Sequence, residues 1–229
     1  MRRLLVTGFG PFPRVPDNPS AQLAKGLAAD PRWRRRGVDA QALVLDTAYS
    51  SVADALLPAI RAFSPDAVLM LGVAARRRRV TPEFRALNRA SRLYPDVSGA
   101  VAAGSLRLEK DAPLVRRTHA PVSLMVDRLR ARGLAAAVSR DAGRYLCNAA
   151  YFAALGESER GRSFACAFVH VPLPGKGRPL TNRRSGARTP SRVSHLDIFD
   201  CATLLLCSIV DIPGNSATLT RIPRRRRLH

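Results

Sequence analysis

The sequence predicts an α/β protein with a mostly parallel sheet covered by helices on both faces, and three observations lead to this fold class. Short apolar runs of strand length recur along the chain, and segments with helical periodicity separate them. Strands that alternate with helices in this way typically form a parallel sheet between two helical layers. The 229 residues, 46% of them hydrophobic, suffice for one substantial core. We therefore expect a single domain over residues 1–212 and a basic, disordered tail over residues 213–229.

A strand, a loop and a helix are expected at the start of the chain. Residues 3–7 (RLLVT) form an apolar run that stops at two nearby glycines, which is typical of a buried strand that ends in a loop. The loop that follows is dense in proline and glycine, and Ser20 at its end can cap a helix over residues 21–29. Residues 38–45 (VDAQALVL) are expected to form the second strand.

The next two elements are a helix and the clearest strand. Residues 51–63 (SVADALLPAIRAF) carry apolar side chains at helical spacing. Pro58 lies within them and lacks a backbone N–H group, so we expect a kink or a break there. Residues 67–71 (AVLML), which end at Gly72, are continuously apolar, as expected for a strand buried on both faces.

The middle of the chain changes character after Gly72. Residues 74–99 are polar and irregular, and we expect them to hold one short strand at the sheet edge. Residues 121–132 (PVSLMVDRLRAR) predict an amphipathic helix, and the next residue, Gly133, is favourable just past a helix end. Residues 135–139 predict a short strand.

The last third of the chain completes the alternation. A helix is expected from about residue 148 to residue 155, and residues 164–171 (FACAFVHV) predict another buried strand. Residues near 173–193 are rich in glycine, proline and arginine without an apolar period, so we expect a flexible loop. Residues 198–209 predict a final apolar helix.

The charge of the chain is far from neutral. The formal net charge is +21 and the isoelectric point is near 11.6, and nearly all of the positive charge is arginine because only three residues are lysine. Such a charge attracts nucleic acids and anionic surfaces non-specifically. Charge runs alone usually mark solvated faces, so we expect a solvated basic surface; a dedicated nucleic-acid site is the less favoured alternative.

The four cysteines and the apolar segments bear on metal binding and location. Cys147, Cys166, Cys201 and Cys207 form no CxxC pair, which argues against a zinc site. The N-terminal apolar run is too short for a signal peptide, and no segment approaches the length of a membrane span. We therefore expect a soluble, cytoplasmic protein with reduced thiols.

Cys147 and His170 are candidates for a nucleophile and its base. Cys147 stands where a helix is expected to begin, and the unpaired N–H groups there can lower a thiol pKa and hold an oxyanion. His170 closes an apolar strand, so it is expected at the sheet edge where binding groups gather in such folds. Each residue also has a structural interpretation, a small core cysteine and a hydrogen-bonded histidine. Glu83 by itself cannot be distinguished from a surface acid.

Several motifs around these residues occur in a fixed order. They are TGFGPF at 7–12 with NPS at 18–20, G-x-A and VTPE between residues 72 and 83, S-x-x-AG-x-YLCN at 139–148, and FVHVP at 168–172. In this order and spacing the chain resembles the pyroglutamyl peptidase I family of cysteine peptidases, also called pyrrolidone-carboxylate peptidases. The resemblance runs from residue 4 to about residue 172 and weakens beyond it.

The resemblance implies a catalytic triad and an activity. Cys147 matches the family's nucleophile, His170 its general base and acid, and Glu83 the acid that orients the histidine. The family's fold is an open α/β/α sandwich, its members often assemble as tetramers, and its reaction removes N-terminal pyroglutamate from peptides without a cofactor. The implied partners are therefore such peptides and further copies of this chain, with no membrane and only non-specific contact with nucleic acid.

The resemblance also implies substrate contacts. Phe9, Phe12, Tyr145 and Leu146 match residues that line the family's substrate pocket, and Arg92 lies in a segment that resembles the family's Arg-x-Pro-Asp with one extra residue. A five-membered lactam is flat and mostly apolar, so it suits an aromatic slot. Without the resemblance, the two phenylalanines could equally be hydrophobic anchors of a loop.

The chain departs from the family pattern after its third strand. The family usually has Gly-Gln-Ala-Gly-Gly-Arg where this chain has GVAARR at residues 72–77. Val73 cannot donate a side-chain hydrogen bond to a substrate, and Arg76 in place of glycine is expected to restrict or reshape the turn. Phe84 stands where the family has a basic residue. These departures bear on substrate preference and turnover.

A second function remains open from the sequence. A non-catalytic protein on the same fold could use the arginine runs against nucleic acid or acidic partners, with a steep salt dependence. The runs lack interleaved aromatic residues and belong to no nucleic-acid motif, which disfavours this alternative. The runs in question are Arg34–Arg36, Arg76–Arg79 and Arg224–Arg227. A nucleoside-processing enzyme on a similar sheet has only fold-level support.

Overall fold

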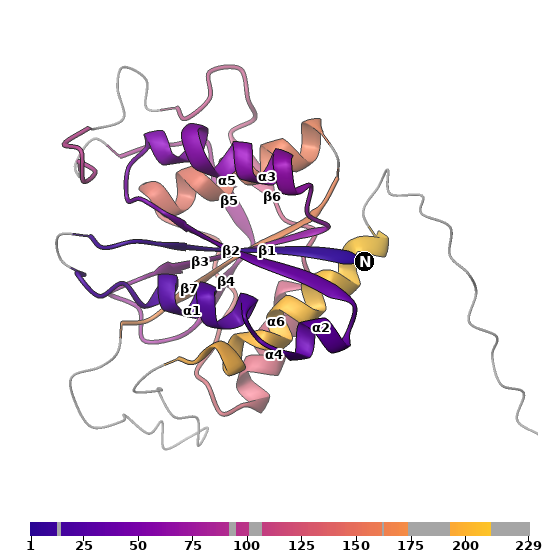
Figure 1. Ribbon diagram of the computed structural model, residues 1–229. Coiled ribbons are helices and arrows are strands. Elements are labelled where there is room, and N and C mark those ends of the chain that lie inside the picture. The colour runs from indigo at the N-terminus through magenta and orange to yellow at the C-terminus, as the bar shows by residue number, and fades with distance from the viewer. Residues whose placement is uncertain (13–14, 92–94, 101–106, 162, 174–192, 212–229) are drawn as a thin grey trace, which may run out of the picture.

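A five-stranded sheet forms the centre of the molecule (Figure 1). The computed structural model describes the whole chain except residues 13–14, 92–94, 101–106, 162, 174–192 and 212–229. Four strands run parallel, and β4 pairs antiparallel with β7 at one edge. In spatial order the strands are β2 (Val38–Leu45), β1 (Arg2–Phe9), β3 (Ala67–Val73), β7 (Ala165–Val171) and β4 (Thr81–Glu83). The predicted α/β class with a mostly parallel sheet is confirmed.

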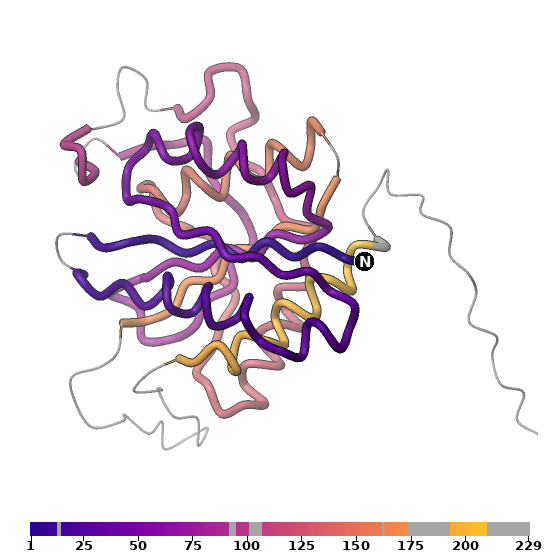
Figure 2. The backbone as a smooth tube through the Cα atoms, in the orientation of Figure 1, coloured from indigo at the N-terminus to yellow at the C-terminus, as the bar shows by residue number. Residues whose placement is uncertain are grey.

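Helices cover both faces of this sheet, as Figures 1 and 2 show. One face packs against α1 (Pro19–Ala28), the short α2 (Arg32–Arg35), α4 (Val122–Ala131) and α6 (His195–Cys207), which continues as a 3-10 turn (Ser208–Asp211). The other face packs against a π-helical turn (Val52–Leu56), α3 (Leu57–Phe63) and α5 (Leu146–Arg160).

Two hydrophobic cores result from the alternation of side chains along the strands. Leu69 and Leu71 of β3 belong to the core shared with α1, α4 and α6, whereas Val68 and Met70 belong to the core shared with α3 and α5. Because successive side chains of a strand point to opposite faces, a strand that is apolar at every position must be covered on both sides. The continuous apolar runs that predict strands therefore also predict two helical layers.

A second, two-stranded sheet lies beside α5 and was not predicted from the sequence. It consists of β5 (Arg85–Leu87) and β6 (Val115–Arg117), which pair antiparallel. The guanidinium of Arg116 is only 3% exposed, donates to the Phe152 carbonyl oxygen, and is paired with Glu109 and Glu159. Three-residue strands carry too little periodicity to be recognised in the sequence, so only these tertiary contacts define the two-stranded sheet.

Several elements follow the sequence prediction closely. The strand over residues 38–45 has the predicted bounds, and the helix over 121–132 is present as α4, with Gly133 in the left-handed region at φ 78°. Where a kink or a break was expected, the chain changes helix type but stays helical, without a break at Pro58. A π-helical turn precedes it, and Pro58 becomes the second residue of α3, where a missing N–H group does no harm.

Three local predictions were wrong. Residues 135–139 make only isolated bridges, Ala136 to Val80 and Ser139 to Glu83, because their partner β4 is too short for a continued ladder. Asn18, not Ser20, caps α1 by accepting the Ser20 N–H, while the Ser20 hydroxyl accepts the Phe9 N–H.

The start of α5 was placed two residues too late, since the helix begins at Leu146 rather than near residue 148. The loop expected near 173–193 lies almost entirely outside the described residues, and so does the tail at 213–229. Within the described residues, none of the helices is both long and apolar enough to cross a membrane.

Candidate active site

The first residues of α5 pack against the carboxyl ends of β3 and β7, and the contact is made at Gly72. Gly72 and His170 are register partners in neighbouring parallel strands. A Cβ atom built on Gly72 would lie 2.9 Å from the Cys147 Sγ atom. The thiol therefore occupies the space that a side chain at position 72 would fill, directly beside the strand that carries His170. The sequence prediction that both residues lie at this edge of the sheet is confirmed.

His170 lies on the same face of the sheet as Cys147. Cys166 and Phe168, which precede it at two-residue spacing on β7, belong to the core under α5, and Cys147 packs against that same core. The rings of Phe168 and His170 lie 4.7 Å apart between centroids, so the phenylalanine forms one wall of the histidine's surroundings. His170 is 4% exposed.

Glu83 is the buried partner of His170. The Nδ1 atom of His170 lies 2.8 Å from the Glu83 Oε1 atom, and Glu83 is completely buried. A carboxylate only accepts hydrogen bonds, so this contact assigns the ring proton to Nδ1 and leaves Nε2 as the basic nitrogen. Glu83 is therefore not a surface acid, which the sequence alone could not decide.

Arg77 completes this arrangement and was missed as a site residue. Its Nη1 atom donates to Glu83 Oε1 at 2.5 Å and to Thr81 Oγ1 at 2.6 Å, and its Nη2 atom donates to the Asp141 carbonyl oxygen. One guanidinium thus joins the segment after β3, the edge strand β4 and the segment before α5. In the sequence, Arg77 is one of four consecutive arginines, and nothing local distinguishes it from its neighbours.

The electrostatics favour an ionised Glu83 beside a neutral His170. Burial raises the pKa of Glu83, but the hydrogen bond and charge of His170, aided by Ser139 and Arg77, bring it below its usual value. The Glu83 Oε2 atom has no hydrogen bond of acceptable geometry within the described structure, although the Ser139 hydroxyl is close enough to act on the pKa. Burial is the main cause that lowers the pKa of His170, and the hydrogen bond and charge of Glu83 act in the opposite direction without restoring it.

Cys147 is a neutral thiol in the resting site. Burial of the sulfur raises the pKa of Cys147 to about 12, and the charge of Glu83 adds to this effect. The residue's own backbone N–H group and Arg77 act in the opposite direction, as expected at a helix start, but they are outweighed. The lowering of the thiol pKa expected at a helix start is therefore present as one contribution, but burial outweighs it.

The comparisons agree with this geometry. A family model described as pyroglutamyl peptidase matches residues 2–190 of the chain. The chain belongs to the pyroglutamyl peptidase family.

Individual relatives support this assignment. The chain is 31% identical to the pyrrolidone-carboxylate peptidase of Bacillus subtilis over 172 residues, which cover 75% of this chain and 78% of that protein. It is 36% identical to the pyrrolidone-carboxylate peptidase of Thermococcus kodakarensis, again over 172 residues, covering 75% of this chain and 81% of the relative.

Solved structures show the same fold over nearly the whole chain. Pyroglutamyl peptidase I of Bacillus amyloliquefaciens superposes with a TM-score of 0.72 at 26% identity, covering 92% of this chain and 98% of that one. The pyrrolidone carboxyl peptidase of Thermococcus litoralis gives the same TM-score and identity, with 97% and 100% covered.

Three aromatic rings gather beside the thiol of this family member. Tyr145, the residue before α5, lies with its ring centroid 6.0 Å from that of Phe12 and 5.9 Å from that of Tyr49. Tyr49 was not predicted to lie beside the thiol, because a lone tyrosine in a polar segment has no sequence pattern that distinguishes it. Its hydroxyl is buried and has no hydrogen bond in the described structure.

The other predicted substrate contacts are placed differently. Phe9 and Leu146 are 4% and 2% exposed and belong to the core under α5, so their role as contacts stays a prediction. Arg92 lies outside the described residues.

Asn148 holds the beginning of α5 in place. Its side chain is buried, accepts the Leu87 N–H, and donates to the carbonyl oxygens of Leu87 and Arg89. The residue directly after the thiol is thus bound to β5 through both of its amide atoms. These contacts explain why an asparagine follows Cys147 in a helix that is otherwise apolar at this end.

The family departures at positions 73 and 76 have small local consequences. Val73 packs against the core under α1, α4 and α6, on the face of the sheet opposite to Cys147. The Arg77 N–H donates to the Ala74 carbonyl oxygen and closes a turn in which Arg76 does not have a positive φ. An ordinary L residue therefore fits this turn as it stands in this chain.

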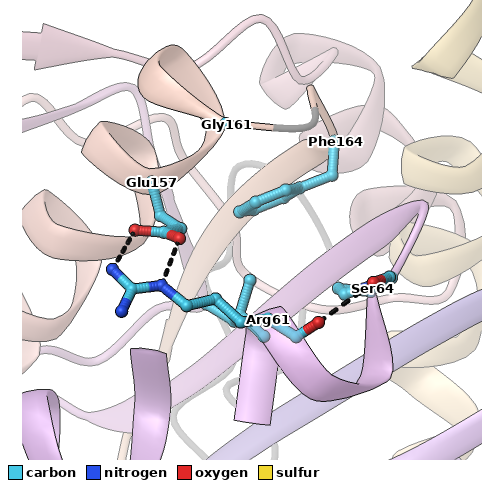
Figure 3. A pocket seen from close by; sticks show the side chains of 7 residues that line it. Arg61, Ser64, Glu157, Gly161 and Phe164 are labelled. Atoms are coloured by element: carbon cyan, nitrogen blue, oxygen red, sulfur yellow. Dashed lines mark hydrogen bonds and ion pairs between the residues drawn. The ribbon is translucent and has the colours of Figure 1, made fainter. Parts of the chain in front are cut away.

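A hollow of about 280 Å³ lies elsewhere on the molecule (Figure 3). Ser64 and Pro65, which precede β3, and Phe164, which precedes β7, help to line it. The ion pair between Arg61 and Glu157 forms another part of its wall. It therefore lies at the amino ends of the strands, opposite to Cys147. Within the described residues, no group of three or more His, Cys, Asp or Glu side chains could hold a metal ion.

Proposed function

We propose that this chain is a cysteine peptidase that removes N-terminal pyroglutamate from peptides, with Cys147 as the nucleophile, His170 as the general base and acid, and Glu83 as the orienting acid. The observation that carries this proposal is the buried hydrogen bond between Glu83 and His170, next to the thiol that lies over Gly72. A nucleophile, a base and a group that orients the base are what covalent catalysis of this type needs. Membership of the pyroglutamyl peptidase family supports the choice of substrate.

The neutral thiol and neutral imidazole suggest how the first step proceeds. As Sγ of Cys147 forms a bond to the carbonyl carbon that follows the lactam ring, Nε2 of His170 takes the thiol proton. The carbonyl oxygen becomes an oxyanion, and the N–H groups at the start of α5, which have no partner within the helix, are available to it. Ionised Glu83 stabilises the resulting imidazolium through Nδ1.

The remaining steps restore the enzyme. The imidazolium gives its proton to the leaving amine, the C–N bond breaks, and a thioester to Cys147 remains. Water then attacks the thioester carbonyl and loses a proton to Nε2, and the C–S bond breaks as the proton returns to sulfur. Pyroglutamate and the shortened peptide are the products.

The lactam ring is proposed to lie against Phe12, Tyr49 and Tyr145. The ring centroids of Phe12 and Tyr49 lie 6.0 and 5.9 Å from the ring centroid of Tyr145. The three rings together give an aromatic surface suited to a flat, uncharged ring. Phe9, Leu146 and Arg92 are included on the strength of the family resemblance alone. From the same resemblance we propose a cytoplasmic enzyme that assembles as a homo-oligomer, with the tetramer as the expected form.

A fluorogenic pyroglutamyl-coumarin amide tests the activity. The wild-type protein should release the dye, and Cys147→Ala should release none, while Cys207→Ser, which alters the exposed cysteine of α6, should retain the wild-type rate. A glutaminyl-coumarin amide, in which the ring is open, should not be cleaved. Release of dye by Cys147→Ala, or no release by folded wild-type protein, would contradict the proposal.

Alkylation provides a second readout that needs no turnover. In the Cys207→Ser background, iodoacetamide should modify Cys147 first, because Cys166 and Cys201 are buried. Peptide mapping by mass spectrometry measures the modified fraction of Cys147, and the loss of dye-releasing activity should be proportional to this fraction. Inactivation without modification of Cys147 would contradict its role as the nucleophile.

A further inference from the structure

Two arginine-bearing segments flank the thiol, and Arg77 fastens them together. The first segment, residues 74–79, follows β3 directly after Gly72 and Val73, and the second, residues 139–145, leads into α5 and Cys147. The bond from Arg77 Nη2 to the Asp141 carbonyl oxygen joins the two segments. Arg85 of β5 ties the second segment to β5 by donating to the Arg140 carbonyl oxygen.

The side chains of these segments are strongly basic and exposed. We call their five exposed arginines the arginine rim: Arg76, Arg78, Arg79, Arg140 and Arg144. Arg77 differs from its neighbours because its guanidinium is used for Glu83 and Thr81. Asp141 is the sole exposed carboxylate within the two segments, and its side chain accepts the Gly143 N–H.

The rim is not neutralised by the rest of the described structure. Some exposed arginines elsewhere have a carboxylate partner, as Arg61 has in Glu157 and Arg132 has in Asp200. Within the described residues, no ion pair to a carboxylate involves any arginine of the rim. Five exposed positive charges thus lie on the two segments that flank the thiol, whereas Glu83 is completely buried. Such a field raises the local concentration of anions and stabilises them when they are bound.

We propose that the arginine rim selects peptides with acidic residues immediately after the N-terminal pyroglutamate. This inference rests on the proposed function, because it concerns the leaving peptide of that reaction. The pyroglutamyl ring is uncharged and is proposed to lie inward against the aromatic rings, so the rest of the peptide must leave the thiol past the two segments that flank it. Its first side chains therefore meet the rim, where a carboxylate is attracted and an ammonium group is repelled.

The test compares three peptides that differ at one position: pyroglutamyl-Glu-Ala-Ala, pyroglutamyl-Ala-Ala-Ala and pyroglutamyl-Lys-Ala-Ala. At about 20 mM NaCl we expect kcat/KM for the Glu peptide to exceed that for the Lys peptide by at least about fivefold, with the Ala peptide between them. At about 500 mM NaCl the ratio should fall towards one, because the rim is exposed and its charges are screened.

Matched variants localise the effect. Arg76→Gln with Arg144→Gln removes one charge from each segment and should lower the Glu-to-Lys ratio at least about twofold. Arg34→Gln with Arg35→Gln removes the same charge from α2, at the amino ends of the strands, and should leave the ratio unchanged. If the rim variant does not fold, the salt dependence of the wild-type ratio decides the question without it.

The outcomes separate this inference from the function on which it rests. Equal cleavage of all three peptides at low salt, or an equal fall of the ratio in the α2 variant, would overturn the rim while leaving the pyroglutamyl peptidase activity in place. No cleavage of any of the three peptides by folded protein would instead overturn the proposed function.

Discussion

His170 is the residue whose titration should set the acid limit of activity. Burial lowers its pKa below the ordinary value of 6.5. The base is active only when neutral, so activity is retained above this lowered pKa and is lost as the pH falls through it. We expect the acid limb of kcat/KM to have its midpoint below pH 6.5, measured with a substrate whose charge does not change in this range. A midpoint above 6.5 would contradict the lowered pKa of His170.

Substitutions of Arg77 should shift the acid limb of the pH dependence of kcat/KM in a predictable direction. Its charge contributes to the lowering of the His170 pKa, and its guanidinium holds the carboxylate that His170 contacts. Arg77→Gln should therefore move the acid limb to higher pH and reduce kcat more than it raises KM. Arg77→Lys, which keeps the charge but not the fork of donors, should restore the position of the limb and only part of kcat. A purely structural residue would lower activity without moving the limb.

Gly72 is the residue against which the thiol is seated. A Cβ atom there would lie 2.7 Å from Cζ of Phe168 and 2.9 Å from Sγ of Cys147, so both side chains would have to move. We expect Gly72→Ala to lower kcat/KM on the order of 100-fold, because small displacements of reacting groups have effects of this size. Val73→Ala, at the next residue but on the other face, is the control and should retain most activity. Equal losses in both variants would point to general damage of β3.

At the scale of elements, the joint between α5 and β5 fixes the nucleophile. Asn148→Ala would leave the N–H and carbonyl groups of Leu87 and the carbonyl oxygen of Arg89 without their partner. We expect a loss of about 2–3 kcal/mol in the free energy of unfolding, measured by urea denaturation. Asn148→Asp keeps the acceptor for Leu87 but loses both donated bonds, so it should also destabilise the protein. A change below about 0.5 kcal/mol in Asn148→Ala would contradict this role.

Helices and strands were predicted well from the sequence where residues close to them in the chain determine them, and poorly where distant residues do. The β2 and α4 segments could be predicted well because apolar periodicity and a helix-ending glycine act within a few residues. The strand expected at residues 135–139 failed because a strand exists only through its partner, and the partner is short. The cap of α1 was placed at Ser20 instead of Asn18 because both residue types can cap a helix, and the competing bond from Phe9 is not local.

At the scale of the whole molecule, the net charge of +21 should make stability sensitive to salt. Self-repulsion destabilises a compact, highly charged protein, and screening relieves it. We expect the melting temperature at pH 7 to rise by about 2–4 °C between 20 and 300 mM NaCl, which corresponds to roughly 1 kcal/mol for a chain of this size. Sodium chloride suits this scan, because sulfate would also strengthen hydrophobic burial. A constant or falling melting temperature would show that the basic charge is already compensated.

The position of the arginine runs disfavours a dedicated nucleic-acid protein. Arg34–Arg36 lie at and just after α2, at the amino ends of the strands, whereas Arg76–Arg79 follow β3 at the carboxyl ends (Figure 1). These two runs therefore lie at opposite ends of the strands and do not combine into one surface. The third run, Arg224–Arg227, lies outside the described residues. Association with DNA or RNA should accordingly be weak at 150 mM salt, as titration of a labelled duplex would show.

The sequence by itself determined the fold class, the family and the identity of Cys147, His170 and Glu83 as candidates, because apolar periodicity and ordered motifs are properties of the chain. Only the tertiary structure decided that Glu83 is buried against His170, that Arg77 and not its three arginine neighbours serves that carboxylate, and that Tyr49 joins Phe12 and Tyr145. It also decided that burial outweighs the helix start in setting the pKa of the Cys147 thiol. Desolvation and pairing depend on what surrounds a group in space, and those surroundings come from segments far apart in the chain.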